Sequence, residues 1–185
     1  MLPYTFEVFS LDHIVSIIVI LFLFIIFLGY NDKIGIEDDS KTFLIVLSVL
    51  MIFLDLSEDL VRIFTGYYSI TKDLPLQLCS IGVYLAAFNL MYRNQTIFNL
   101  IFYWGFVGAT NAILTPDGDL FELRIFFFYS QGYHAALIFA VLWMMIKYDM
   151  RMDYRSILQV VIYTNIIVGL ITIVNYVLCL LYTSD

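Results

Sequence analysis

Cys79 is the residue of this sequence best suited to covalent chemistry. It follows residues 73–78 (Asp-Leu-Pro-Leu-Gln-Leu), where Asp73 suits a helix N-cap and Pro75 suits a first helical turn, so an apolar helix is predicted to begin at Leu74. Cys79 would then lie about one and a half turns, roughly 7 Å, into that helix. Such a thiol is most often a small buried hydrophobe, and it attacks a substrate only as the thiolate. A catalytic role for Cys79 therefore requires a general base.

The chain contains two histidines, His13 and His134, and either can serve as that base. A carboxylate such as Glu58 or Asp55 would orient the imidazole, which completes a pattern of nucleophile, base and orienting acid. The spacing of these residues along the sequence does not tell whether they meet.

An acidic cluster occupies one face of a predicted helix. Asp55, Glu58, Asp59 and Arg62 are spaced i, i+3, i+4 and i+7, which places all four on the same side. A charge inside a bilayer is costly unless it is paired or hydrated. Pairing of Arg62 with Glu58 or Asp59 near the membrane surface accounts for Asp59 and Arg62. Asp55 and Glu58 lie deeper, and we expect both to face the interior of the helix bundle.

The composition identifies an integral membrane protein. Of the 185 residues, 62% are hydrophobic and 14% are charged, and the mean hydropathy is +0.92. The apolar runs suit helices of about 20 residues, the length that crosses a bilayer core. The net charge of −7 provides no basic face for nucleic acid, so membrane lipids are the predicted partners. Cys79 and Cys179 form no disulfide framework or metal motif, and no metal or cofactor is predicted.

The predicted fold is all-α: a polytopic transmembrane bundle in one domain over residues 1–185. The first apolar run lacks a basic segment before it, so we interpret it as a retained helix rather than a cleaved signal peptide. Six helices are predicted, at about residues 13–30, 42–66, 74–92, 97–114, 120–146 and 155–182.

The distribution of cations predicts the orientation of these helices in the cell membrane. The connections after the first, third and fifth helices hold six of the nine cations. These six are Lys33, Lys41, Arg93, Lys147, Arg151 and Arg155. The positive-inside rule then places the N-terminus outside the cytoplasm and the acidic cluster in the outer half of the membrane. The candidate binding residues are His13, Asp55, Gln77, Asn111 and Arg124. The orientation places Asp55 and Arg124 in the outer half of the membrane and His13 at its outer edge.

Several short motifs occur in a fixed order along the chain. They are Phe-Ser-Leu-Asp-His at residues 9–13, Leu-Pro-Leu-Gln-Leu-Cys at 74–79, Phe-Tyr-Trp-Gly at 102–105, Leu-Thr-Pro-Asp at 114–117, His134, Asn165, and Asn-Tyr at 175–176. In this order the chain resembles the YwaF-like bacterial integral membrane proteins, which are similar in turn to the eukaryotic transmembrane protein 164 family.

The resemblance implies an activity. The eukaryotic relatives are regarded as cysteine-dependent phospholipid acyltransferases that act through a Cys and a His, which correspond here to Cys79 and His134. The chain departs from the family pattern twice: Ala135 follows His134 where the family tends to have Gly, and Gln77 stands where the family tends to have His. The family usually has a seventh helix, so we expect this chain to be truncated before it, with residues 179–185 (CLLYTSD) resembling translated adapter sequence.

These observations leave three functions open. The leading hypothesis is a membrane-embedded acyltransferase-like protein that moves an acyl chain between phospholipids through a thioester on Cys79, with His134 as base and Glu58 or Asp55 as its orienting acid. The first alternative is a small transporter or a protein that binds lipids or cations through the acidic cluster, so that substitutions of the acids would matter more than those of Cys79. The second is a structural membrane protein without chemistry, in which neither set of substitutions matters except through folding.

Overall fold

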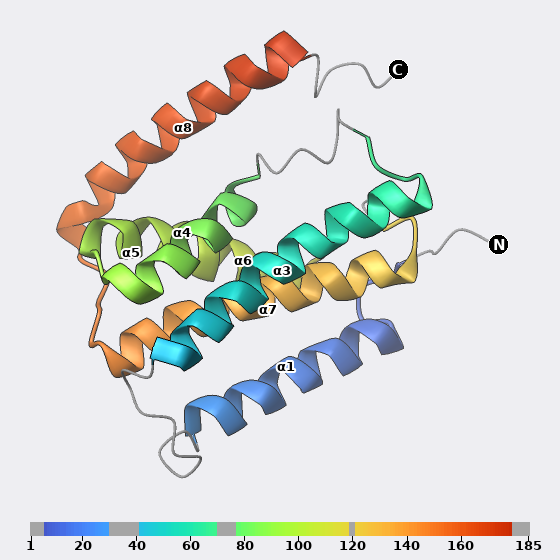
Figure 1. Ribbon diagram of the computed structural model, residues 1–185, viewed down its shortest axis with the longest axis horizontal. Coiled ribbons are helices and arrows are strands. Elements are labelled where there is room, and N and C mark those ends of the chain that lie inside the picture. Colours follow the sequence, from blue (N-terminus) through green and yellow to red (C-terminus); the bar gives the residue numbers. More distant parts are fainter. Residues whose placement is uncertain (1–5, 30–40, 70–76, 119–120, 179–185) are drawn as a thin grey trace.

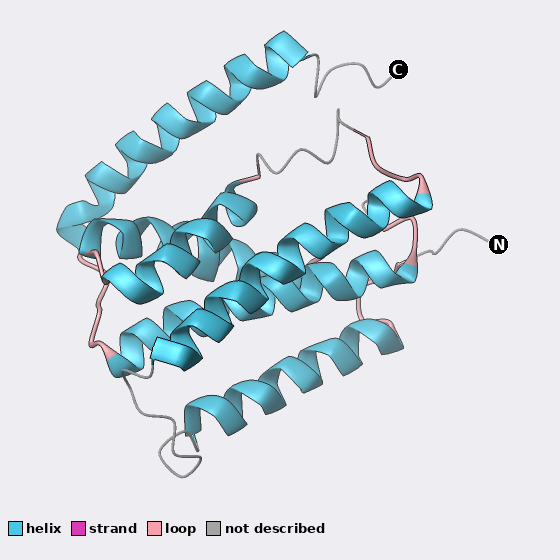
Figure 2. Cartoon of the chain, in the orientation of Figure 1, coloured by secondary structure: helices cyan, strands magenta, loops and turns pink. Residues whose placement is uncertain are grey.

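The computed structural model describes residues 6–29, 41–69, 77–118 and 121–178. Within these residues the secondary structure consists of helices joined by turns and loops, with no strand (Figure 2). The predicted all-α fold is confirmed, and the described residues form six helical segments when the consecutive elements α5, η1 and α6 are taken as one.

The helices follow the apolar runs of the sequence. In chain order they are α1 (Leu11–Gly29), α3 (Lys41–Thr65), α4 (Leu78–Tyr92), α5 (Gln95–Ile101), the π-helix η1 (Phe102–Val107), α6 (Gly108–Leu114), α7 (Arg124–Lys147) and α8 (Ile157–Leu178). Among the described residues, four segments are long and apolar enough to cross a membrane. These are Leu11–Gly29, Gln95–Leu114, Arg124–Lys147 and Tyr154–Val177.

Helix α7 is the centre of the bundle. It packs against α3, α4 and α6, and α1 lies along another of its sides (Figure 1). Its side chains Leu137, Val141, Trp143 and Met144 are completely buried. Such an apolar surface all round is typical of a helix enclosed by other helices.

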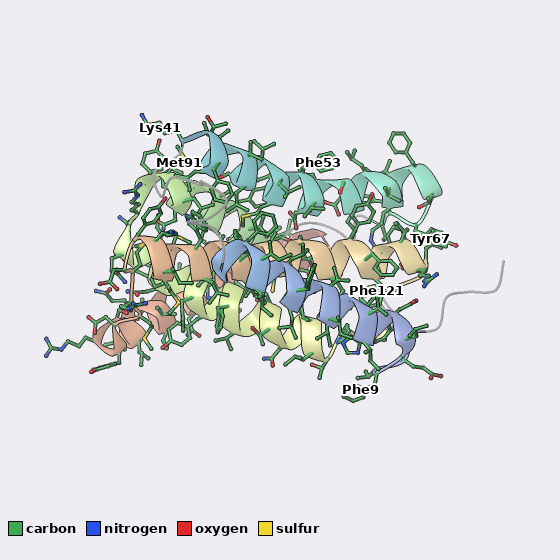
Figure 3. All side chains as sticks on the ribbon, turned by 90° about the horizontal axis from the view of Figure 1, so that it is seen from below. Phe9, Lys41, Phe53, Tyr67, Met91 and Phe121 are labelled. Atoms are coloured by element: carbon green, nitrogen blue, oxygen red, sulfur yellow. The ribbon has the colours of Figure 1, made fainter. Side chains whose placement is uncertain are left out.

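The two ends of the bundle can be recognised from single residues. Phe9, Tyr67 and Phe121 lie at one end, and Lys41 and Met91 lie at the other (Figure 3). The first end also holds the start of α1, the start of α7 and the end of α3, because α3 runs antiparallel to the other two (Figure 1). The acidic cluster is therefore near this end.

Helix α8 stands apart from the other helices (Figure 1). It contacts them through Val160, which packs with Leu100 and Trp104, and through Thr164, whose hydroxyl accepts a 2.9 Å hydrogen bond from the indole Nε1 of Trp104. Most of its other apolar side chains are exposed, as expected for a helix that faces lipid.

The predicted start of the third helix at Leu74 is wrong. Gln77 has extended backbone angles (φ −71°, ψ 140°) and is the N-cap of α4, and its carbonyl accepts the first helical hydrogen bond from the Ile81 N–H at 3.1 Å. Asp73 and Pro75, on which the prediction rested, lie outside the described residues. Cys79 is therefore the second residue of the helix and not one and a half turns inside it.

Other boundaries also differ from the predictions. Helix α7 begins at Arg124 rather than near Leu120, because Leu123 has extended backbone angles (φ −126°, ψ 145°). Before α8 the chain makes a 3₁₀ turn over Tyr154–Ser156, and the α-helix begins only at Ile157. The predicted end of this helix near residue 182 lies outside the described residues.

The π-helix η1 interrupts the predicted helix 97–114 and was not predicted from the sequence. Its Gly105 lies tightly against α7: a Cβ atom added there would lie 3.0 Å from Cγ of Leu137. The absence of a side chain at Gly105 therefore lets η1 approach the central helix. Interruptions of this kind often occur at functional sites.

Candidate functional site

Cys79 lies in the first turn of α4, beside the π-helix. Its thiol is half-buried and lies 3.9 Å from the carbonyl oxygen of Trp104, and a Cβ atom added at Gly108 would lie 3.6 Å from Sγ. The N–H groups of a first helical turn have no acceptor within the helix and carry the positive end of its dipole. The thiol therefore sits where backbone groups can stabilise a negative charge.

Asp55 joins α3 to α4 next to this thiol. Its Oδ1 accepts a 3.0 Å hydrogen bond from the hydroxyl of Ser80, the residue that follows Cys79. Its Oδ2 is buried and makes no hydrogen bond of normal geometry to any described residue. The expectation that Asp55 faces the bundle interior is confirmed.

Glu58 belongs to a different set of contacts. Its Oε1 accepts hydrogen bonds from Arg62 Nε at 3.2 Å and Arg62 Nη2 at 3.1 Å, while Arg62 Nη1 donates to Glu122 at 2.8 Å. The guanidinium also lies over the ring of Phe126, 4.1 Å from its centroid. The predicted pairing of Arg62 within the cluster is confirmed for Glu58. These contacts of Arg62 join the end of α3 to the start of α7.

His134 is buried in the middle of α7, and its orientation is set by its own helix. Its Nδ1 lies 2.8 Å from the Ser130 carbonyl oxygen, which can only accept, so Nδ1 carries the proton and Nε2 carries the lone pair. The orienting partner of this imidazole is thus a backbone carbonyl, whereas Glu58, the carboxylate predicted for that role, is paired with Arg62.

Tyr133 lies beside His134 in α7 and was missed in the sequence. Its side chain is buried, and its ring lies 4.1 Å from the ring of His134, centroid to centroid. Cys79 and His134 themselves share no hydrogen bond within the described part of the chain. Tyr133 stands in the sequence among other aromatic residues of α7, and nothing in its spacing distinguishes it from a packing residue.

His13 is a structural residue. Its Nδ1 accepts a 3.0 Å hydrogen bond from the backbone N–H of Phe9, so Nε2 carries the proton and donates to the Ile113 carbonyl at 2.8 Å. The ring is completely buried and packs edge-on against Phe127. With both nitrogens engaged, His13 ties α1 to α6 and has no lone pair left for a general base.

The remaining candidate binding residues lie away from Cys79 or are exposed. Arg124 pairs with Asp12, through Nε at 2.6 Å and through Nη2, and so joins the first turns of α7 and α1. Asn111 is exposed on α6. Gln77 is exposed as well and makes no side-chain capping bond. Among the described residues, no group of three or more His, Cys, Asp or Glu side chains is arranged to hold a metal ion.

The long apolar helices, packed around a central helix, define a multi-pass helical membrane protein. Comparison with protein families gives a match to the TMEM164 family over residues 8–182. The chain belongs to the TMEM164 family. No curated protein and no solved structure matches it.

Proposed function

We propose that this protein is a cysteine-dependent acyltransferase that moves an acyl chain between membrane phospholipids. The observation that carries the proposal is the position of Cys79, whose thiol stands in the first turn of α4, beside Gly108 and next to the Asp55–Ser80 pair. The family resemblance, which assigns this chemistry to the corresponding cysteine, supports the same residue.

In the first half-reaction the Cys79 sulfur attacks the carbonyl carbon of a phospholipid ester. His134 Nε2 takes the thiol proton and returns it to the alkoxide that leaves, so that a lysophospholipid departs and an acyl thioester remains. The backbone N–H groups of Cys79 and Ser80 are the candidate donors for the tetrahedral oxyanion, because first-turn N–H groups have no acceptor within the helix.

In the second half-reaction His134 takes a proton from the hydroxyl of a lysolipid, and the resulting oxygen nucleophile attacks the thioester. The C–S bond breaks, the new ester leaves, and Cys79 takes the proton back from His134. The hydrogen bond from Nδ1 to the Ser130 carbonyl supports this role, because it leaves the lone pair on Nε2 at the start of each half-reaction. No cofactor is needed.

The proposal includes a bacterial, YwaF-like origin and a location in the cell membrane with the N-terminus outside. The positive-inside distribution of cations supports this orientation. Reporter fusions after Lys41 and after Arg151 are both expected to report the cytoplasm. Either fusion on the outside would reverse the orientation and move Cys79 to the inner leaflet.

Trapping of the thioester tests the chemistry. The full chain, reconstituted in vesicles that contain phosphatidylcholine with a radiolabelled acyl chain, is expected to acquire a label that neutral hydroxylamine removes. Cys79→Ala should abolish the label, and Cys179→Ala, at the other cysteine of the sequence, should retain it. Labelling of a folded Cys79→Ala protein to the wild-type level would refute the proposal. If Asp55→Leu and Glu58→Gln abolish a measured ion flux while Cys79→Ala has no effect, the protein is a transporter instead.

A further inference from the structure

Trp104 contacts both Cys79 and the helix α8. Its main-chain carbonyl oxygen lies 3.9 Å from the Cys79 thiol, which donates to it. Its indole Nε1 donates a 2.9 Å hydrogen bond to the hydroxyl oxygen of Thr164. The side chain of Trp104 is buried, so the indole N–H needs this acceptor. One residue of the π-helix η1 therefore connects the candidate nucleophile to a helix that otherwise stands apart from the bundle (Figure 1).

The π-helix explains why this carbonyl accepts from a thiol. In a regular α-helix the N–H of Gly108 would donate to the carbonyl of Trp104, four residues earlier. In this chain the Gly108 N–H donates instead to the carbonyls of Tyr103 and Gly105. The Trp104 carbonyl therefore does not receive the hydrogen bond that a regular helix would give it from Gly108, and the Cys79 thiol lies within its reach.

Thr164 lies on the face of α8 that meets the bundle. Val160, Thr164 and Ile167 are spaced i, i+4 and i+7, so they share one face of the helix. Val160 and Ile167 pack in the same apolar cluster as Trp104. Among the described residues, the bond from Trp104 to Thr164 is the one side-chain hydrogen bond between α8 and another helix. It therefore fixes the position of the indole relative to α8.

We propose that Trp104 is a positioning residue for Cys79: Thr164 holds its indole, and its carbonyl in turn holds the thiol, so that the sulfur keeps one direction. This role rests on the proposed function, since it takes Cys79 as the nucleophile. Rotation about the Cβ–Sγ bond can turn the thiol proton toward His134 without moving the sulfur. A sulfur held in one place loses less freedom when it attacks, so α8 contributes to acyl transfer without contacting the reacting atoms.

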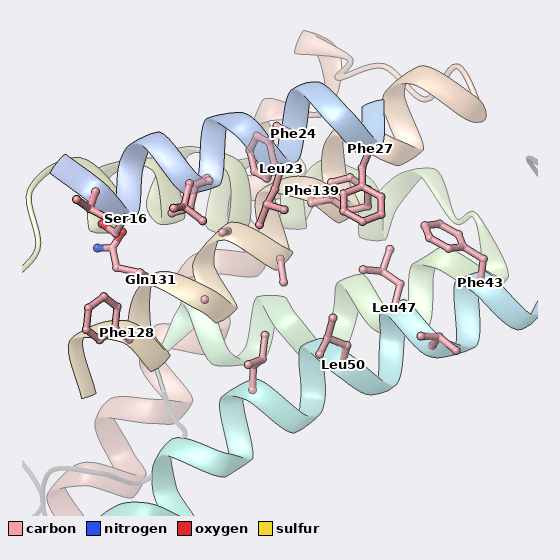
Figure 4. Close-up of a pocket in the computed structure, with 18 residues that line it drawn as sticks. Ser16, Leu23, Phe24, Phe27, Phe43, Leu47, Leu50, Phe128, Gln131 and Phe139 are labelled. Atoms are coloured by element: carbon pink, nitrogen blue, oxygen red, sulfur yellow. The ribbon is translucent and has the colours of Figure 1, made fainter. Parts of the chain in front are cut away.

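An apolar cavity of about 540 Å³ is separate from this arrangement. All of its lining residues belong to α1, α3 and α7 (Figure 4). No residue of α4, η1 or α8 is among them. A substitution in the cavity, such as Leu50→Ala, therefore alters the packing of the bundle and leaves the contacts of Trp104 in place. It serves as a control for general effects on packing.

The S–H stretching band in the infrared spectrum tests the role of Trp104 without acyl transfer. In the full chain with Cys179→Ala, Cys79 provides the only thiol. A thiol is a weak donor, and its band moves to lower frequency when it donates a hydrogen bond. Thr164→Val removes the acceptor of the indole and should move the band to higher frequency, whereas Thr164→Ser keeps a hydroxyl and should retain the wild-type band. An unchanged band in a folded Thr164→Val protein would overturn the role of Trp104.

A second threonine of α8 provides the matched control. The Thr172 hydroxyl donates to the Val168 carbonyl of its own helix, so Thr172→Val should leave the band unchanged, as should Leu50→Ala. Trp104→Phe removes the donor and should move the band as Thr164→Val does. The two changes together should move it no further, because they remove the same bond. An equal movement of the band in Thr172→Val or Leu50→Ala would show a general effect on packing and refute the proposal.

The rate of thioester formation distinguishes this role from the proposed function. With the radiolabelled phosphatidylcholine of the trapping experiment, Thr164→Val should lower the maximal rate about 10- to 10²-fold, because positioning is lost. The lipid concentration that gives half of this rate should not change, since lipid binding is kept. An unchanged maximal rate in Thr164→Val would overturn the role of Trp104 while the proposed function stands. If the wild type forms no thioester, the proposed function fails, and the infrared band still decides whether Trp104 holds the thiol.

Discussion

The Ser80 hydroxyl donates a 3.0 Å hydrogen bond to Asp55 Oδ1 and thereby joins α4 to α3 one residue after Cys79. Ser80→Ala removes this donor from a buried carboxylate, and we expect the free energy of unfolding to fall by about 1–3 kcal/mol. Ser80→Ala combined with Asp55→Leu should cost less than the sum of the single changes, because the carboxylate is then gone. Denaturant unfolding in detergent measures both, and strict additivity would show that the bond contributes nothing.

Arg62 is expected to be the most sensitive charged residue for stability. Arg62→Met leaves the partly buried Glu58 carboxylate without this partner and should cost about 3 kcal/mol, and adding Glu58→Gln should recover part of that loss. The exposed pair Arg151–Asp149 provides a control, since Arg151→Met should cost less than about 1 kcal/mol. Equal losses of unfolding free energy for Arg62→Met and Arg151→Met would show that the ion pairs of Arg62 contribute no more to stability than an exposed pair.

Two glycines that contact the same leucine should respond differently to alanine. A Cβ at Gly105 would lie 3.0–3.2 Å from the buried side chain of Leu137, whereas one at Gly82 would lie 3.5 Å away, at ordinary contact distance. Gly105→Ala is therefore expected to lower stability by about 1–2 kcal/mol relative to Gly82→Ala. Thermal unfolding of the two variants compares them directly, and an equal or higher midpoint for Gly105→Ala would be inconsistent with tight packing of the π-helix.

Substitution of His13 should affect the stability of the protein, whereas substitution of His134 should affect the rate of thioester formation. His13→Asn loses the hydrogen bond to Ile113 and should lower the unfolding midpoint, while the folded fraction still forms the acyl thioester. His134→Asn should leave a folded protein that forms the thioester about 10²- to 10⁴-fold more slowly, the usual contribution of a general base. The measurement is hydroxylamine-sensitive label per folded molecule. Normal labelling by His134→Asn would remove that residue from the proposed chemistry.

The bundle of helices was predictable because long apolar runs and short polar breaks leave few alternatives. The inward position of Asp55 followed from its helical spacing with Glu58 and from the cost of exposing a carboxylate to lipid. The start of α4 was not predictable, since Gln77 and its apolar neighbours suit a helix although the backbone at Gln77 is extended. Local residue types do not determine that choice.

The roles of the polar residues were harder to predict. Each histidine bonds to a backbone carbonyl, His13 to that of Ile113 and His134 to that of Ser130, and only His13 also accepts a bond from a backbone N–H, that of Phe9. Every residue type provides such carbonyls, and every type except proline provides such N–H groups. The amide of Gln131, which is buried without a hydrogen-bond partner among the described residues, likewise follows no pattern in the sequence. Contacts of this kind appear only when the helices are placed in space.

The π-helix at residues 102–107 also determines how far α6 is rotated about its axis relative to α5. One residue corresponds to about 100° of rotation in an α-helix, so the wider turn makes α6 present a different face from the one that an uninterrupted helix would present. Deletion of a single residue there would restore a regular helix and turn Gly108 away from the Cys79 thiol. The chain thus keeps one residue more than a straight helix requires, and that residue determines which side of α6 meets α4.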